Sequence, residues 1–188
     1  GRAPVGGLSE GSGRTHADRA VSVVVDPIDG STNEHAGLPW YASSLCAVDA
    51  DGPVAAVVVN QATGQRFRAV RGEGATVDGR RLRPPTKTDL ADSLVAVSGW
   101  PPYHLGWRQF RALGASALDI CAVAAGVPDA FLEATSPPAR GPWDSTGALV
   151  RRPEAGAVER ARVGSDRLVA AADATGRTRA AVGAAGAA

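Results

Sequence analysis

The sequence predicts a layered fold of the mixed α/β (α+β) class that contains a meander of antiparallel strands. Between Pro39 and Leu82, four apolar, strand-like segments alternate with turns rich in Gly and Asp, as in consecutive hairpins. Residues 113–133 contain a longer apolar segment of helical length. Strand segments outnumber helical ones, but both kinds are present, so we expect layers around a shared core.

The N-terminal half supplies most of the expected strands. Residues 1–20 are rich in glycine and polar residues and predict a loop. Residues 21–25 read VSVVV, an apolar run short enough for a buried strand, which Asp26 ends and after which Pro27 fixes a turn. The segments WYASSLCAV, PVAAVVVN, QRFRAV and ATVDG then predict strands, and DADG, QATG and RGEG predict the turns between them.

The C-terminal half begins with another strand, SLVAVSGW, at residues 93–100. A helix is expected from Ala115 to Ala125, where Gly126 stops it, and a strand follows at residues 129–133. A further helix starts near Trp143, with the next residue in a capping position. We expect one domain over residues 1–175 and a disordered tail of Ala, Gly and Arg over residues 176–188.

Composition excludes several classes of protein. The 188 residues include 20 basic and 19 acidic side chains, a formal charge of +1, which argues against an electrostatic nucleic-acid binder. No apolar run approaches the roughly 20 residues that span a bilayer, so no membrane association is expected. Cys46 and Cys121 lie in apolar segments far apart in the chain and are expected to be buried thiols, which favours the cytoplasm.

The segment VVVDPIDGSTN, residues 23–33, carries the most chemical information. Asp26 and Asp29 follow a buried strand, and Gly30 allows close approach of the backbone to a ligand. Two neighbouring carboxylates repel each other unless a cation lies between them, and oxygen ligands favour Mg²⁺ over zinc. The backbone amides of GSTN, at an expected helix start, are suited to hold a phosphate. Metal-assisted phosphoryl chemistry is therefore predicted.

Structural alternatives exist for each part of this pattern. A D-x-x-D-G segment taken alone is more often a surface turn. A second acidic motif, PWDSTG at residues 142–147, favours a functional site over a surface turn, although Asp144 taken alone is more often a helix cap.

The two segments DPIDGST and WDSTGALV, in this order and spacing, resemble the signature segments of the inositol monophosphatase family. Similarity extends to GLSEGSG at residues 7–13, GEGATVDGRRL at residues 72–82 and LGASALDICAVAAGVPDAFLE at residues 113–133, and covers residues 7–172. Members are Mg²⁺-dependent, lithium-sensitive phosphatases of small phosphate monoesters. The resemblance implies a layered α-β-α-β-α sandwich of the sugar-phosphatase type, two or three Mg²⁺ ions that Mn²⁺ can replace, a small phosphorylated metabolite as substrate, and a homodimer.

The resemblance also assigns roles to individual residues. It implies metal ligation by the acids of both motifs and of the N-terminal segment, and by one carbonyl: Glu10, Asp26, Ile28, Asp29 and Asp144. Glu10 and the Ser31 hydroxyl are implied to activate the attacking water, and the amides around Gly30, Ser31 and Thr32 to hold the phosphate. The rest of the substrate is implied to contact Gly114, Ala115, Ser116, Glu133 and Asp144. For Glu133 a surface acid at the end of a strand is an equal alternative.

The chain departs from the family pattern in places. The helices that precede the first acidic motif in the family are expected to be missing here. Glu10 is followed by Gly11, where the family often has a second acid. Pro153 lies within an expected helix, which should therefore kink or stop early.

Two other functional readings remain open. A haloacid-dehalogenase-type phosphatase also places an acid after an apolar strand, but its chemistry needs D-x-D rather than D-x-x-D. A catalytically impaired relic that binds metal, phosphate or a partner without turnover fits the departures from the pattern. Within the phosphatase reading the substrate stays open among inositol phosphates, histidinol phosphate, fructose bisphosphate and adenosine bisphosphate.

Overall fold

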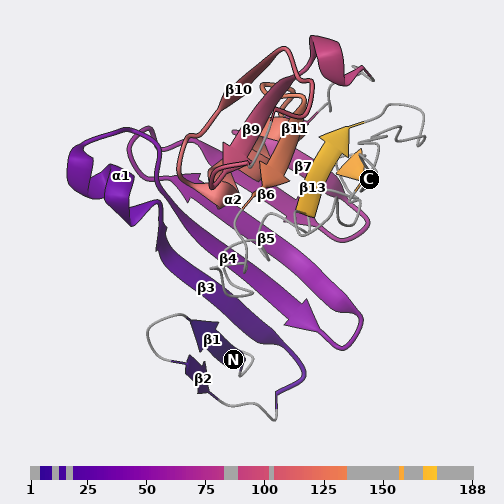
Figure 1. The fold of residues 1–188 in the computed structure, drawn as a ribbon. Helices are drawn as coiled ribbons and strands as arrows, with labels where there is room; N and C mark the ends of the chain where they lie inside the picture. The colour runs from indigo at the N-terminus through magenta and orange to yellow at the C-terminus, as the bar shows by residue number, and fades with distance from the viewer. Residues whose placement is uncertain are drawn as a thin grey trace, which may run out of the picture.

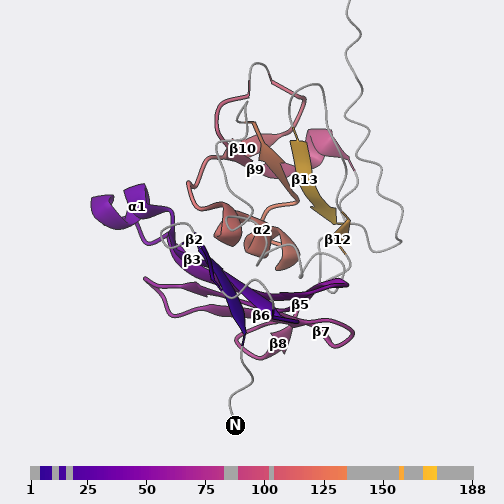
Figure 2. The same ribbon diagram turned by 90° about the horizontal axis from the view of Figure 1, so that it is seen from below.

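The computed structural model describes residues 5–9, 13–15, 19–82, 89–101, 104–134, 157–158 and 167–172. Within these ranges the chain forms two β-sheets with a helix between them (Figures 1 and 2). The predicted mixed α+β class, with a multi-stranded sheet and few helices, is confirmed. The helix start expected near Trp143, the kink at Pro153 and the tail over residues 176–188 lie outside the described residues.

The first sheet has eight strands in the order β2-β1-β3-β4-β5-β6-β7-β8. β1 pairs with β3 in parallel, and every other pair in this sheet is antiparallel, so the sheet is mixed. In chain order, its strands and the helix between β3 and β4 are β1 (Gly6–Ser9), β2 (Gly13–Thr15), β3 (Ser22–Asp29), α1 (Ser31–Ala36), β4 (Ala42–Asp49), β5 (Gly52–Asn60), β6 (Arg66–Val70), β7 (Gly74–Val77) and β8 (Arg80–Arg81).

The second sheet has five strands in the order β10-β9-β11-β13-β12. β9 pairs in parallel with β10 and β11, while β13 runs antiparallel to β11 and β12. In chain order, its strands and the helical elements between them are the 3₁₀ turn η1 (Leu90–Asp92), β9 (Leu94–Ser98), β10 (Gln109–Arg111), α2 (Ser116–Ala124), β11 (Ala130–Glu133), β12 (Ala157–Val158) and β13 (Arg167–Ala172).

Helix α2 forms the layer between the sheets (Figure 2). All nine of its residues are buried, because one side packs on Val58 and Phe67 of the first sheet and the other on Ala96 and Phe131 of the second. A helix that is apolar on nearly all sides, as SALDICAVA is, can only be accommodated in such a two-sided position. The shared core therefore fixes where the N-terminal end of α2 lies relative to β3.

The structure tests the expected elements one by one. The four strands of the meander, the strand within residues 93–100, the helix ending before Gly126 and the strand that ends at Glu133 are confirmed. The loop expected over residues 1–20 is wrong in part, because β1 and β2 lie there. These glycine-rich segments carry little strand propensity, and they form strands because β1 pairs with the edge of β3.

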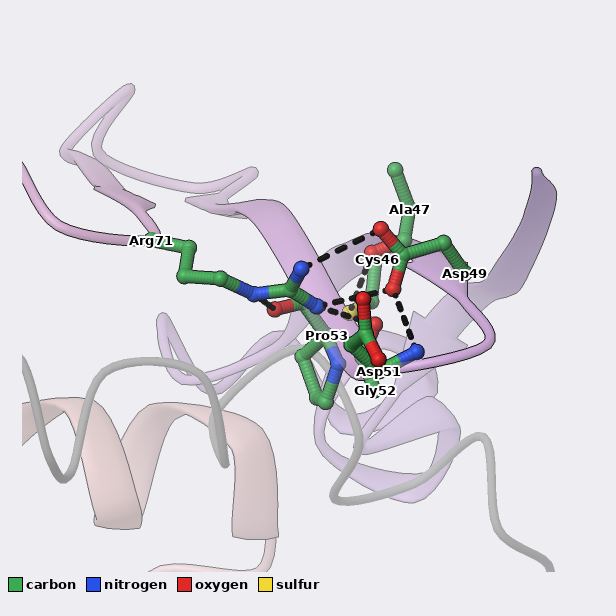
Figure 3. A network of polar contacts seen from close by, with 7 residues as sticks. All are labelled: Cys46, Ala47, Asp49, Asp51, Gly52, Pro53 and Arg71. Atoms are coloured by element: carbon green, nitrogen blue, oxygen red, sulfur yellow. Dashed lines mark hydrogen bonds and ion pairs between the residues drawn. The ribbon is translucent and has the colours of Figure 1, made fainter. Parts of the chain in front are cut away.

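One polar network joins the turn between β4 and β5 to the turn between β6 and β7. The guanidinium of Arg71, just after β6, donates two hydrogen bonds to the carboxylate of Asp49, of 3.1 and 2.9 Å (Figure 3). It also donates to the carbonyls of Gly52 and Pro53. The Asp51 amide donates to Asp49 Oδ1 across the turn. This bidentate pair lowers the pKa of Asp49 from its ordinary value, mainly through the hydrogen bonds from Arg71.

Two further expectations concern packing and membranes. Cys46 and Cys121 are buried in the core, as predicted. In the part of the chain that the structure describes, the two α-helices have six and nine residues, and neither is long enough to cross a bilayer.

Candidate functional site

A β-bulge directs Asp26 and Asp29 to the same face of the first sheet. Side chains alternate along a regular strand, so residues three apart would point to opposite faces. Here Asp26 pairs with Ser44 and Asp29 with Ala42, which means that β3 carries one extra residue. Ala42 and Ser44 both lie on the buried face, and the two acids opposite them are only 5% and 2% exposed, Asp29 and Asp26 respectively. The expectation that Asp26 ends the strand is therefore wrong, since β3 continues to Asp29.

Each of these acids is held by a backbone amide. Asp26 Oδ1 accepts a hydrogen bond of 3.1 Å from the N–H of Ile28 within the bulge. Asp29 Oδ2 accepts a buried hydrogen bond of 2.7 Å from the N–H of Ala117. Ala117 lies in the first turn of α2, which has no side-chain cap of its own. Asp29 thus supplies the negative group that the N-terminal end of a helix favours.

Gly30 makes the sharp turn from β3 into α1. Its φ is +83°, and a Cβ there would lie 2.9 Å from the Cβ of Ala115 and 3.1 Å from the carbonyl of Trp40. Only glycine fits this position without strain. The first amides bonded within α1 are those of Asn33 and Glu34, which donate to the Gly30 carbonyl. Ser31 and Thr32 precede them at the exposed start of the helix, in agreement with the predicted helix start.

Three residues whose side chains had no predicted role join this turn to α2. The buried Asn33 side chain donates 2.7 Å hydrogen bonds to the carbonyls of Trp40 and Leu113. The Trp40 indole donates a 2.9 Å hydrogen bond to Asp119 Oδ1 in the middle of α2. The only signal in the sequence was that Asn33 closes the DPIDGSTN segment, and nothing there identifies its partners. Gly114 and Ala115 lie directly after Leu113, so the predicted substrate segment is brought next to Gly30.

The donor set fits a hard divalent cation. Two buried carboxylates share one face, and the buried hydroxyls of Ser44 and Ser116 have no hydrogen-bond partner among the described residues. Ser44 lies opposite Asp26 in the β3–β4 pair, and Ser116 directly precedes Ala117. Buried carboxylate and hydroxyl oxygens of this kind suit Mg²⁺ or Mn²⁺ and offer no soft ligand for zinc.

The remaining predicted residues divide into two groups. Glu133 ends β11 in the second sheet, is 9% exposed and pairs with Ser98 of β9. It is therefore not the exposed surface acid considered as an alternative, and its contact with a substrate stays a prediction. Glu10 and Asp144 lie outside the described residues. Within the described ranges, no three His, Cys, Asp or Glu side chains form a cluster that could hold a metal.

Comparisons with known proteins identify the family of this chain. The model of the inositol monophosphatase family matches residues 6–185. The Nus factor SuhB of Escherichia coli K12 is 34% identical over 168 residues, which cover 80% of this chain and 61% of that protein. A fructose-1,6-bisphosphatase of Pyrococcus furiosus is 30% identical over 161 residues, which cover 85% and 63%. The chain thus spans about three fifths of the length of these curated relatives.

The fold has close counterparts among solved structures. The crystal structure of the extragenic suppressor protein suhB of Bartonella henselae superposes with a TM-score of 0.77 at 32% identity, over 85% of this chain and 68% of that one. The match of the family model over nearly the whole chain, together with the two acids and the glycine turn of its first motif, settles the classification: the chain belongs to the inositol monophosphatase family.

Proposed function

We propose that this protein hydrolyses the phosphate monoester of a small polyol or sugar in a Mg²⁺-dependent reaction. The observation that carries the proposal is the bulge in β3, which turns Asp26 and Asp29 to one buried face beside the exposed start of α1. Burial of two neighbouring carboxylates is costly, and a bound divalent cation would offset their repulsion. The similarity to a fructose-1,6-bisphosphatase and the family's description as inositol monophosphatases support a phosphorylated sugar or polyol as the substrate.

Four acids would hold the metal ions. Asp26 and Asp29 supply two carboxylates from the bulge, the Ile28 carbonyl adds a backbone oxygen, and Glu10 and Asp144 complete the set. Four carboxylates balance the charge of two divalent cations. Bound cations would stabilise negative charge on the attacking and leaving oxygens of the phosphate.

The other residues would bind and orient the reactants. The amides of Gly30, Ser31 and Thr32 precede the first hydrogen bond within α1, so they can donate to phosphate oxygens. The Ser31 hydroxyl, exposed beside them, would orient the attacking water together with Glu10.

The sugar or polyol would lie against the N-terminal end of α2 and the end of β11. There Gly114, Ala115 and Ser116 offer backbone groups, and Glu133 and Asp144 would accept hydrogen bonds from substrate hydroxyls.

Release of inorganic phosphate from a panel of inositol, fructose and nucleotide phosphates tests the proposal. Wild-type protein should release phosphate from at least one ester with Mg²⁺ and none with EDTA. Asp26→Asn should lose this activity by about 10³-fold or more, since it removes a metal ligand. Asp51→Asn is the matched control, because Asp51 is an exposed acid in the turn after β4. Equal rates for Asp26→Asn and wild type would reject the proposed site.

A binding role without turnover is the second candidate, favoured by the similarity to Nus factor SuhB. In that case Mg²⁺ would raise the melting temperature while no ester in the panel released phosphate.

We also propose a homodimer in the cytoplasm, supported by the family and by the buried thiols Cys46 and Cys121. Light scattering behind size-exclusion chromatography would measure the mass of the assembly.

A further inference from the structure

The side chain of Asn33 joins two loops that are distant in the sequence. Its Nδ2 donates one 2.7 Å hydrogen bond to the carbonyl of Trp40 and another to the carbonyl of Leu113, 80 residues away. Asn33 itself is 8% exposed. Both protons of one buried amide group are thus used between two loops, and neither loop has a strand or helix hydrogen bond to the other at this point.

Two glycines show how closely the loops approach each other. A Cβ on Gly30 would lie 3.2 Å from the Gly114 carbonyl and 2.9 Å from the Cβ of Ala115. A Cβ on Gly114, where φ is +87°, would lie 3.1 Å from Nδ2 of Asn33. The amide of Asn33 therefore lies where the two segments approach each other too closely for a Cβ on either glycine to fit without strain.

The turn that precedes Asn33 and the loop that contains Leu113 carry different parts of the proposed site. Residues 30–32, directly before Asn33 in the chain, carry the backbone donors assigned to the phosphate. Leu113 leads through Ala115 into α2, whose Ala117 amide holds the carboxylate of Asp29. A change in the separation of the loops would move the phosphate donors relative to the metal-binding acid.

We propose that Asn33 is a positioning residue that fixes the distance between the phosphate-binding turn and the N-terminal end of α2. The inference deepens the proposed function and rests on it. Asn33 acts through Gly30 and Leu113 and needs no contact with the substrate. A primary amide is the group required, because it presents two donors to two carbonyls without carrying a charge. An aspartate of the same shape has no donor and would repel both carbonyls.

The pair Asn33→Asp and Asn60→Ala tests this role in steady-state kinetics with the best ester of the panel. Asn33→Asp should lower kcat by about 10- to 100-fold, while KM changes less than about threefold, because misplaced groups bind substrate but react slowly. Asn60 is the matched control: it is also a buried asparagine, and it closes the turn after β5 through the Ala62 and Thr63 amides and the Pro39 carbonyl. Asn60→Ala should lower the melting temperature but leave kcat within about twofold.

Three results would overturn the inference. A folded Asn33→Asp protein with wild-type kcat shows that the spacing does not matter for the reaction. An equal loss of kcat in Asn60→Ala shows that general destabilisation explains the effect. If Asn33→Asp does not fold, Asn33→Ser replaces it as the test variant, because serine introduces no buried charge. An unchanged kcat in Asn33→Ser would then overturn the inference.

Amide hydrogen exchange separates this inference from the proposed function. The Ala117 amide donates to Asp29, and the Asp119 amide donates to the Ala115 carbonyl. Both amides should exchange faster in Asn33→Asp than in wild type, and their exchange rates should be unchanged in Asn60→Ala. If wild-type protein hydrolyses no ester, the proposed function fails, and this measurement still decides whether Asn33 holds the loops together. Unchanged exchange at both amides would overturn the connection itself.

Discussion

The carboxylate of Asp29 accepts a hydrogen bond of 2.7 Å from the backbone N–H of Ala117, 88 residues further along the chain. One side chain therefore connects the bulge of β3 to the first turn of α2, the helix that lies between the two sheets. In the proposed site Asp29 has two roles: it caps a helix through one oxygen and contributes a carboxylate to metal binding. These roles can be separated by substitution.

Asp29→Asn should remove metal binding but keep the helix cap, because the amide oxygen can still accept from Ala117. In EDTA its free energy of unfolding should equal or exceed that of wild type, since the repulsion with Asp26 is relieved. Mg²⁺ should raise the melting temperature of wild type by several degrees and that of Asp29→Asn by much less. Asp29→Ala should lose about 1–3 kcal/mol even in EDTA, because the Ala117 amide is left buried without a partner. Chemical denaturation and thermal melting measure both effects; equal stability of the alanine and asparagine variants would contradict the cap.

Gly30→Ala and Gly37→Ala should differ in cost although both glycines have positive φ, +83° and +73°. At Gly37 a Cβ meets nothing within 4 Å, so the substitution costs only the backbone strain of about 1–2 kcal/mol. At Gly30 the added Cβ would lie 2.9 Å from the Cβ of Ala115, so a steric clash adds to the backbone strain. The loss of unfolding free energy should therefore be larger than at Gly37 by at least about 1 kcal/mol. Urea denaturation of the two variants gives the difference, and similar values would mean that the loops separate easily.

Ser44→Ala and Ser43→Ala test the two faces of β4. The Ser44 hydroxyl is buried without a partner among the described residues, so its removal should leave the free energy of unfolding in EDTA unchanged or raise it by up to about 1 kcal/mol. The Ser43 hydroxyl, on the other face, donates a 2.7 Å hydrogen bond to the Pro27 carbonyl in the bulge. Its removal should cost about 0.5–1.5 kcal/mol. A loss at Ser44 larger than that at Ser43 would show that the Ser44 hydroxyl has a partner in solution.

The Asp49 carboxyl should titrate below its ordinary pKa of 3.8, because it accepts hydrogen bonds from Arg71. Since the folded-state pKa is the lower one, the pair stabilises the fold above the unfolded-state pKa, and this contribution disappears as the pH falls through the folded-state value. Arg71→Gln should return the pKa of Asp49 toward 3.8 and weaken the acid dependence of stability. Carbon-detected NMR of the Asp49 carboxyl reports the pKa directly, and an identical titration in both proteins would refute the assignment. Because the pair is exposed, added salt should reduce the difference.

Local sequence determined much of this protein. Apolar alternation and glycine turns specify the meander from β4 to β7, and the apolar segment before Gly126 specifies α2, because those signals lie within a few residues. The segment DPIDGSTN likewise predicts a site at Asp26, Asp29 and Gly30, from two carboxylates and a glycine that lie within five residues.

Only the tertiary structure decided how these parts meet. Whether Asp26 and Asp29 share a face depends on the pairing of β3 with β4, because the extra residue of the bulge exists only relative to the neighbouring strand. β1 becomes a strand because β3 offers it an edge, and Asn33 finds its second carbonyl 80 residues away. Hydrogen bonds of this range depend on the burial of α2 between two sheets, a property of the packed core that no short segment of sequence encodes.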